Sequence, residues 1–254
     1  MNIVGICRIR NEEGVIENTL KHLEDKIGNI YVYDDCSTDR TVEICKNAPN
    51  VVQVVENEEW ESDPMQRQIL EGEQRQFIYD IAKQENPDWI YYFDADEYAD
   101  FSDINFERAD VDGYKMRFFD FYITPEDVDK PYLERKMIGP EYRDILTLFR
   151  PNPALQFITR QPSNVPKLYI AGYVKHYGKA ISVQQWEDTC DYYINHLWEQ
   201  QPGGLTISKK WKERKGKAIH DMVSDYDNFL IEWRDRGNQQ MIVDNSTGQA
   251  EIKI

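Results

Sequence analysis

The sequence lacks any apolar run approaching the roughly 20 residues that span a bilayer. The stretch 1–9 has no basic segment ahead of its apolar residues, so we expect no signal peptide. Basic side chains are also scarce: 30 lysines and arginines stand against 46 aspartates and glutamates, a formal net charge of −16. This balance argues against a nucleic-acid partner, because phosphate-backbone binding needs a cationic surface. We therefore expect a cytoplasmic protein without a transmembrane segment, free or in peripheral contact with the inner face of a membrane.

Cysteine is rare as well, with four in 254 residues. Their spacing matches neither a metal-ligand pattern nor a dense disulfide framework, so we expect reduced thiols. The 41% of hydrophobic and 30% of charged residues are ordinary for a folded domain. The chain is long enough for one α/β domain with a small appendage.

The first hundred residues alternate between short apolar runs and helical periodicity. Strand patterns and helical patterns follow one another, which predicts a largely parallel sheet flanked by helices. The predicted strands cover 2–7, 30–33, 51–55 and 89–93, and the two clearest helices cover 14–26 and 65–84.

The second half is less regular. Seven prolines between 110 and 172 indicate strands and long loops, the usual place of a variable substrate site. Ser182 and Gln185 form a capping box for a helix that runs to about Glu199. Apolar residues from Ile219 to Trp233 predict a last amphipathic helix that ends near Gly237.

Polar groups follow three of the predicted strands at their carboxyl ends, where parallel sheets bind ligands. Asp94 and Asp96 come directly after the apolar run 89–93, with the small Ala95 between them turned away. Alternating carboxylates can reach one point, and Mg²⁺ or Mn²⁺ favours oxygen ligands shared with substrate phosphates. A solvated acidic turn would carry the same residues.

Three motifs occur in order: Asn11-Glu12-Glu13, then Asp34-Asp35-x-Ser-Thr-Asp-x-Thr41, then Asp94-x-Asp96. Together they resemble glycosyltransferase family 2 and the wider GT-A fold, over roughly residues 1–100. The resemblance implies an α/β GT-A fold with a mixed, mostly parallel sheet and a C-terminal helical extension. It also implies a catalytic domain over 1–204, with a nucleotide-binding half at 1–100 and an acceptor and metal-completing half at 101–204, followed by the extension and tail at 205–254.

The implied activity is metal-dependent, inverting transfer of a sugar from a nucleotide-diphosphate donor to a hydroxyl of a glycan or lipid-linked acceptor, as in polysaccharide biosynthesis. UDP-sugars are the favoured donors, and Mn²⁺ or Mg²⁺ is the implied cofactor. The resemblance implies that the metal is held by Asp94, Asp96 and His176. It implies that the nucleotide sugar is bound by Arg8, Arg10, Asn11, Asp35, Arg75, Asp94 and Lys179.

The general base is the weakest part of the pattern. Relatives carry a His-Glu pair after a Phe-Arg strand, whereas here Phe149-Arg150 is followed by 157–162, which contains no carboxylate. The candidate bases are Asp144, which we favour, and Asp120, with Glu126 and Asp127 behind them.

The sequence leaves room for other functions. A nucleotide-sugar-binding module without catalysis is one alternative, because the His-Glu pair is absent. A sugar nucleotidyltransferase would need a glycine-rich loop with a lysine after the first strand, and residues 9–12 have none. A phosphatase of the Asp-x-Asp-x-Thr type would need the aliphatic hydroxyl of a threonine where Tyr98 stands.

Overall fold

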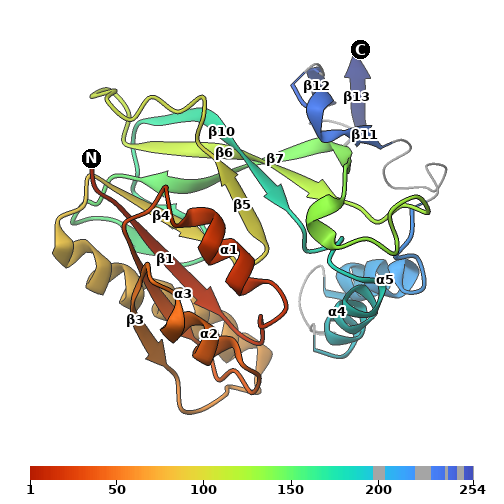
Figure 1. The fold of residues 1–254 in the computed structure, drawn as a ribbon, viewed down its shortest axis with the longest axis horizontal. Coiled ribbons are helices and arrows are strands. Elements are labelled where there is room, and N and C mark those ends of the chain that lie inside the picture. Colours follow the sequence, from red (N-terminus) through yellow and green to blue (C-terminus); the bar gives the residue numbers. More distant parts are fainter. Residues whose placement is uncertain (197–203, 221–229, 238–239, 245–248, 254) are drawn as a thin grey trace. The chain divides into compact units, whose positions relative to one another are not determined.

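The computed structural model describes residues 1–196, 204–220, 230–237, 240–244 and 249–253 (Figure 1). The chain forms two compact units: one consists of 1–117 and 144–174, the other of 118–143 and 175–254. The segment 1–204, which we predicted from the sequence to be one domain, is divided between the two units. Within the described residues no helix is both long and apolar enough to cross a membrane.

The first unit is built on four parallel strands in the order β3-β2-β1-β4. In register, Ile9 of β1 lies opposite Asp34 of β2, and Cys7 lies opposite Phe93 of β4. The carboxyl ends of these strands therefore lie at the same edge of the sheet. The strands are β1 (Ile3–Ile9), β2 (Asn29–Asp34), β3 (Val51–Glu56) and β4 (Trp89–Phe93).

Helices cover both faces of these strands, α1 and α2 on one and α3 on the other (Figure 1). Helix α3 starts where Asp63 accepts hydrogen bonds from the N–H groups of Met65 and Gln66, both at 2.9 Å, and Pro64 occupies the first turn. Helix α3 ends at Ala82 and leads directly into a 3₁₀ turn, which Asn86 closes with a left-handed backbone (φ 51°). The bounds are α1 (Ile16–Leu23), α2 (Thr41–Asn47), α3 (Pro64–Ala82) and the 3₁₀ helix η1 (Lys83–Glu85).

The sheet continues beyond β4 in the order β7-β6-β10-β5, and β4 pairs with β7 antiparallel through Ile90 and Phe149. The predicted fold class, α/β with a mixed, mostly parallel sheet flanked by helices, is confirmed. The chain passes from one unit to the other within β6, β7 and β10. The remaining elements up to the end of this sheet are β5 (Glu97–Asp100), β6 (Gly113–Phe121), η2 (Tyr132–Glu134), β7 (Met137–Phe149), β8 (Gln156–Phe157), β9 (Pro162–Ser163) and β10 (Leu168–His176).

A core between α3 and the sheet fixes the elements that carry the site. Alternate residues of β1 and β4 point toward α3, and the hairpin of β8 and β9 completes this layer through Phe157. Because burial of apolar surface contributes roughly 25 cal/mol per Å², this core stabilises the first unit. The buried members are Val4, Ile6, Tyr31, Ile78, Tyr79, Ala82, Ile90, Tyr92, Leu146, Phe149, Leu155, Phe157 and Val165.

The second unit holds α4 (Val183–His196) and α5 (Gly204–Arg214), which pack around Trp186, Cys190 and Ala218. The Ser182 hydroxyl accepts from the N–H of Gln185 at 3.1 Å, so the predicted start of α4 is confirmed. All four cysteines are free, as predicted.

The helix predicted over 219–237 is wrong for the part that the structure describes. There Ile231–Glu232 form β11, which pairs with β7, and Trp233–Asp235 form the 3₁₀ helix η3. Residues 221–229 of the predicted helix lie outside the described residues. The strand pairing with Ile138 takes precedence over the helical periodicity, as tertiary context often does for a short segment. Two further strands, β12 (Gln240–Asp244) and β13 (Gln249–Lys253), pair antiparallel.

Candidate active site

The candidate site begins at the carboxyl edge of the parallel strands in the first unit. Arg10 and Asn11 follow β1, Asp35 follows β2 and Asp94 follows β4. The register of these strands brings the three chain segments to one edge, as the sequence predicted. The side chains there form two connected polar groups, one around Asp35 and one around Asp94.

Asp35 is buried and has partners on both carboxylate oxygens. Arg8 pairs with Oδ2 at 2.5 Å, while Gln74 and Asn57 donate to Oδ1 at 3.0 and 2.9 Å. Its side chain is only 3% exposed. Asp35 and Arg8, both predicted to bind the nucleotide, thus lie together. A nucleotide that donates a hydrogen bond to Asp35 therefore has to share an oxygen with one of these donors or displace it.

The motif after β2 holds the two loops of this edge together. Asn11, in a left-handed conformation (φ 55°), donates its N–H to the Ser37 hydroxyl at 2.9 Å, and its side-chain oxygen accepts from the N–H of Thr38 at 2.8 Å. Thr41 accepts from the N–H of Glu12 at 2.7 Å. The hydroxyl and amide groups of the motif therefore stabilise the loop that follows β1, a structural role that the resemblance did not assign to Asn11.

A hollow of about 510 Å³ lies beside Asp35, between the end of β3 and helix α3. Its lining includes three aromatic rings, those of Tyr33, Trp60 and Phe77. It also includes three carboxylates and, among the described residues, no basic side chain, so it suits the base of a nucleotide and not its diphosphate; the carboxylates are those of Glu59, Glu61 and Glu73. The guanidinium carbon of Arg10 lies 3.3 Å from the Trp60 ring centroid, a cation–π contact. Planar rings beside polar groups suit a flat ligand such as a nucleobase.

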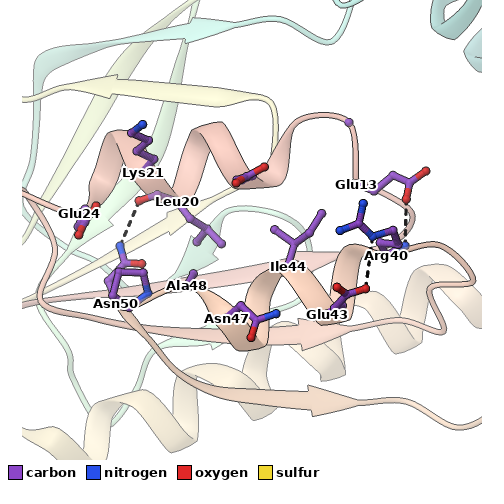
Figure 2. Close-up of a pocket in the computed structure, with 13 residues that line it drawn as sticks. Glu13, Leu20, Lys21, Glu24, Arg40, Glu43, Ile44, Asn47, Ala48 and Asn50 are labelled. Carbon is purple, nitrogen blue, oxygen red and sulfur yellow. Dashed lines mark hydrogen bonds and ion pairs between the residues drawn. The ribbon is translucent and has the colours of Figure 1, made fainter.

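A second hollow, of about 710 Å³, lies between α1 and α2 and contains none of the predicted site residues (Figure 2). Four glutamates, Glu13, Glu17, Glu24 and Glu43, line it, against two basic side chains. One of these, Arg40, already pairs with Glu43 at 3.3 Å (Figure 2). The charged side chains of this hollow are mostly acidic, which does not suit a diphosphate, so we place the candidate site at the sheet edge.

Asp94 is held by a chain of buried polar groups. The hydroxyl of Tyr92 donates to Asp94 Oδ1 at 3.0 Å and accepts from Nε of Arg75 at 2.9 Å. Arg75 also pairs with Glu71 at 3.2 Å, and Glu71 lies 3.7 Å from Arg8. This chain links the group around Asp94 to the group around Asp35. Arg75 is 8% exposed, so it is a buried residue that supports the site, not a solvated helix arginine.

The turn 94–97 directs Ala95 inward, as the sequence predicted. Asp94 and Asp96 are partly exposed, whereas Ala95 is buried and its carbonyl accepts from the Thr19 hydroxyl of α1. The N–H of Asp94 donates to the buried Glu97 at 3.1 Å, which closes the turn. Both aspartates of the motif therefore reach the surface at the sheet edge.

Arg160 is a site residue that the sequence analysis missed. Its Nε lies 3.2 Å from Asp94 Oδ2, and its terminal nitrogen donates to Glu97 Oε1. It lies at the tip of the β8–β9 hairpin, within the segment 157–162. Nothing in the local sequence signals the contact, because 63 or more positions separate Arg160 from its partners.

The donor set around this turn fits a divalent cation. The pKa of Glu12 is raised well above its ordinary value, by burial and then by the charges of Asp96, Asp94 and Asp39. These carboxylates lie close enough to oppose one another's ionisation, and Arg160 balances part of their negative charge. Such a group of carboxylate oxygens suits Mg²⁺ and Mn²⁺, which favour oxygen ligands.

In the second unit Asp120 is surrounded by basic side chains. His176 Nδ1 lies 2.6 Å and Arg143 2.8 Å from its Oδ1, and Lys179 lies 2.7 Å from its Oδ2. These groups hold the pKa of Asp120 well below its usual range, although burial opposes the shift. A carboxylate so stabilised is a poor proton acceptor, which counts against Asp120 as general base.

Asp144, in the first unit, has the opposite environment. Its pKa is raised by burial, which Arg117 and Lys115 only partly offset. Its Oδ1 is buried and accepts no hydrogen bond from the residues that the structure describes. Of the two candidate bases, Asp144 is the better proton acceptor by this criterion. Asp127 is bound by Arg135 at 3.2 Å and by the N–H of Thr124, as a structural residue would be.

Comparison with known proteins gives distant matches. No family model matches the chain. An uncharacterised protein of Mycobacterium tuberculosis and one of Mycobacterium bovis are each 35% identical over 96 residues, which is 38% of this chain and 23% of each relative. The matched segment thus spans less than a quarter of those relatives.

Three solved structures are similar at low identity. Glucosyl-3-phosphoglycerate synthase from Mycobacterium tuberculosis, in complex with Mn²⁺, UDP and glucosyl-3-phosphoglycerate, is 16% identical, with a TM-score of 0.31 over 46% of this chain and 44% of its own. A mycobacterial protein is 11% identical, with a TM-score of 0.39 over 98% and 81%. HddC from Yersinia pseudotuberculosis is 10% identical, with a TM-score of 0.38 over 76% and 100%.

Proposed function

We propose that this chain is a metal-dependent glycosyltransferase of the GT-A type, related to family 2, that uses a nucleotide-diphosphate sugar as donor. The observation that carries the proposal is the turn after β4, where Asp94 and Asp96 reach the surface on either side of the buried Ala95. The three sequence motifs and the parallel strand order support the same activity. UDP-sugars are the donors we favour, with a glycan or lipid-linked hydroxyl as acceptor.

The residues divide the work by their surroundings. Asp96 and Asp94 are the proposed ligands of Mn²⁺ or Mg²⁺, which when bound would act as a Lewis acid on the leaving diphosphate. Tyr92 and Arg160 orient Asp94. The aromatic hollow beside Asp35 is the proposed place of the base, with Arg10 next to it and Arg75 holding the site from behind.

Three predicted groups remain: His176, Lys179 and Asp144. We propose His176 of the second unit as a nitrogen ligand through Nε2, because its Nδ1 is directed at Asp120. Lys179, paired with Asp120, is proposed to neutralise the diphosphate. Asp144 of the first unit is our proposed general base for inverting transfer, since its environment favours proton uptake.

Thermal unfolding tests this proposal with variants of the motif. A ligand present at about 100 times its Kd stabilises the native state by about 2.7 kcal/mol. We expect Mn²⁺ with a UDP-sugar to raise the Tm of the wild type, but not that of Asp94→Ala or Asp96→Ala. Asp188→Ala is the matched control, because Asp188 is exposed and accepts from Gln184 of its own helix. Equal stabilisation of all four proteins would refute the assigned roles.

The second candidate function is a module that binds a nucleotide sugar but has lost catalysis. The segment 157–162, which contains no carboxylate, favours it. Release of nucleoside diphosphate in the presence of an acceptor hydroxyl separates a transferase from a binding module.

A further inference from the structure

Arg160 reaches the carboxylates of the first unit from a fixed position. The β8–β9 hairpin that carries it is held at both ends: Phe157 donates its N–H to Gln76 of α3 at 2.9 Å, and Gln161 accepts from the N–H of Leu146 at 2.9 Å. Helix α3 approaches the hairpin closely at Gly72, where an added Cβ would lie 3.0 Å from the carbonyl oxygen of Ile158. The guanidinium is therefore delivered to Asp94 by the fold.

The charges that Arg160 contacts differ in their access to solvent. Glu97 is fully buried, so Arg160 supplies the positive charge that makes its ionisation tolerable. Asp94 is about one-third exposed, with Oδ1 bound by Tyr92 and Oδ2 facing Arg160. A cation that binds Asp94 through Oδ2 therefore has to share that oxygen with Arg160 or displace it.

We propose that Arg160 is a positioning residue that acts as an internal counter-ion of the metal site and couples metal binding to donor binding. This inference rests on the proposed function. While Arg160 pairs with Asp94, it neutralises part of the negative charge that would otherwise attract a divalent ion. The donor's diphosphate adds negative charge at the same place, so the ion binds tightly only together with the nucleotide. Arg160 thereby disfavours occupation of the site by metal alone.

Removal of Arg160 is expected to change metal affinity in the direction opposite to that of a residue that only supports the fold. Removing Arg160 should strengthen binding of Mn²⁺ alone, because the ion no longer meets a fixed positive charge a few ångströms away. Two charges at about 4 Å interact strongly enough at a protein surface to change affinity by at least about tenfold. A residue that only supports the fold would, when removed, weaken metal binding or leave it unchanged.

The test is an electron paramagnetic resonance titration with Mn²⁺, with and without UDP, on the purified chain. Arg160→Gln should bind Mn²⁺ alone at least about tenfold more tightly than the wild type, and UDP should improve its affinity less. Arg160→Met, which keeps the apolar stem, should behave in the same way and replaces the first variant if that one does not fold. Arg160→Lys should resemble the wild type. Arg108→Gln, which removes an arginine paired with the exposed Asp110, controls for net charge.

The outcomes separate the two proposals. If the wild type binds no Mn²⁺ even with UDP, the proposed function fails. If the wild type binds Mn²⁺ but the charge-removing variants bind it equally or more weakly, the role of Arg160 is refuted while the metal site stands. A lysine variant that binds as tightly as the glutamine variant would also overturn the role, because it keeps the positive charge.

Discussion

The hydroxyl of Tyr92 donates a hydrogen bond to Oδ1 of Asp94, two positions further along the chain, at 3.0 Å. The hydroxyl oxygen of Tyr92 also accepts from Arg75 on α3, so one phenol connects a buried arginine to the motif carboxylate. One residue separates Tyr92 from Asp94 along an extended backbone, so both side chains point to the same face. The orientation of Asp94 is therefore set by the core strand that precedes it.

Tyr92→Phe should lower the free energy of unfolding by about 1–3 kcal/mol, because the Arg75 Nε loses its buried acceptor. Urea unfolding measures the change. Tyr91→Phe is the matched control: the Tyr91 hydroxyl is buried and has no hydrogen-bond partner among the described residues, so its removal should be neutral or stabilising. Equal losses in both variants would show that the Tyr92 hydroxyl contributes no specific bond.

Gly72→Ala should destabilise the protein by about 1–3 kcal/mol, although alanine is the better helix former by about 1 kcal/mol. The added methyl would meet the backbone carbonyls of Phe157 and Ile158 at 3.1 and 3.0 Å, which cannot rotate away like a side chain. Gly14→Ala, with no atom within 4 Å of the added carbon, is the control for chain entropy. A Gly72→Ala protein more stable than the wild type would contradict the close packing of α3 on the hairpin.

Asp34→Asn should stabilise the protein at neutral pH. Burial raises the pKa of Asp34, against the opposing hydrogen bonds from Ser37, so its ionised form is disfavoured in the native state. Above the native pKa the wild type carries this cost, and the neutral asparagine avoids it. As the pH falls through the native pKa, Asp34 takes up its proton and the advantage of the variant should shrink.

Thermal unfolding of the wild type and Asp34→Asn, followed from acid to neutral pH, measures this difference. An advantage that stays constant with pH would mean that the effect is not electrostatic. A variant less stable than the wild type at every pH would mean that the asparagine amide cannot replace the bond that Asp34 accepts from the N–H of Ser37.

Asp144→Asn should lower kcat by about 10² to 10⁴, the usual contribution of a general base, with little change in the affinity for the donor. Steady-state assay of nucleoside diphosphate release measures both quantities. Asp188→Asn is the matched control on α4. Activity that survives in Asp144→Asn would exclude this residue as the base.

The first unit was largely predictable from the sequence, because short apolar runs that end in polar motifs specify parallel strands and the edge at which those motifs meet. The predicted long helix 65–84 corresponds to α3, and the inward turn of Ala95 follows from alternation along an extended chain. These features depend on local periodicity and on a strand order with few alternatives.

What was missed depends on distant pairing. Arg160 meets Asp94 only because a hairpin packs on α3, and no local pattern in 157–162 indicates that contact. The three basic side chains around Asp120 are distant from it in sequence, so its suitability as a base could not be judged from its sequence neighbours. The strand at Ile231 arises from pairing with β7, which the amphipathic pattern of the segment does not reveal.

Anomalous diffraction at the manganese edge, from crystals grown with Mn²⁺ and a nucleoside diphosphate, tests the central claim most directly. We predict one strong peak within coordination distance of an Asp96 or Asp94 carboxylate oxygen and of the diphosphate. A nucleotide bound at the sheet edge without a peak there, or a peak that touches neither aspartate, would contradict the account.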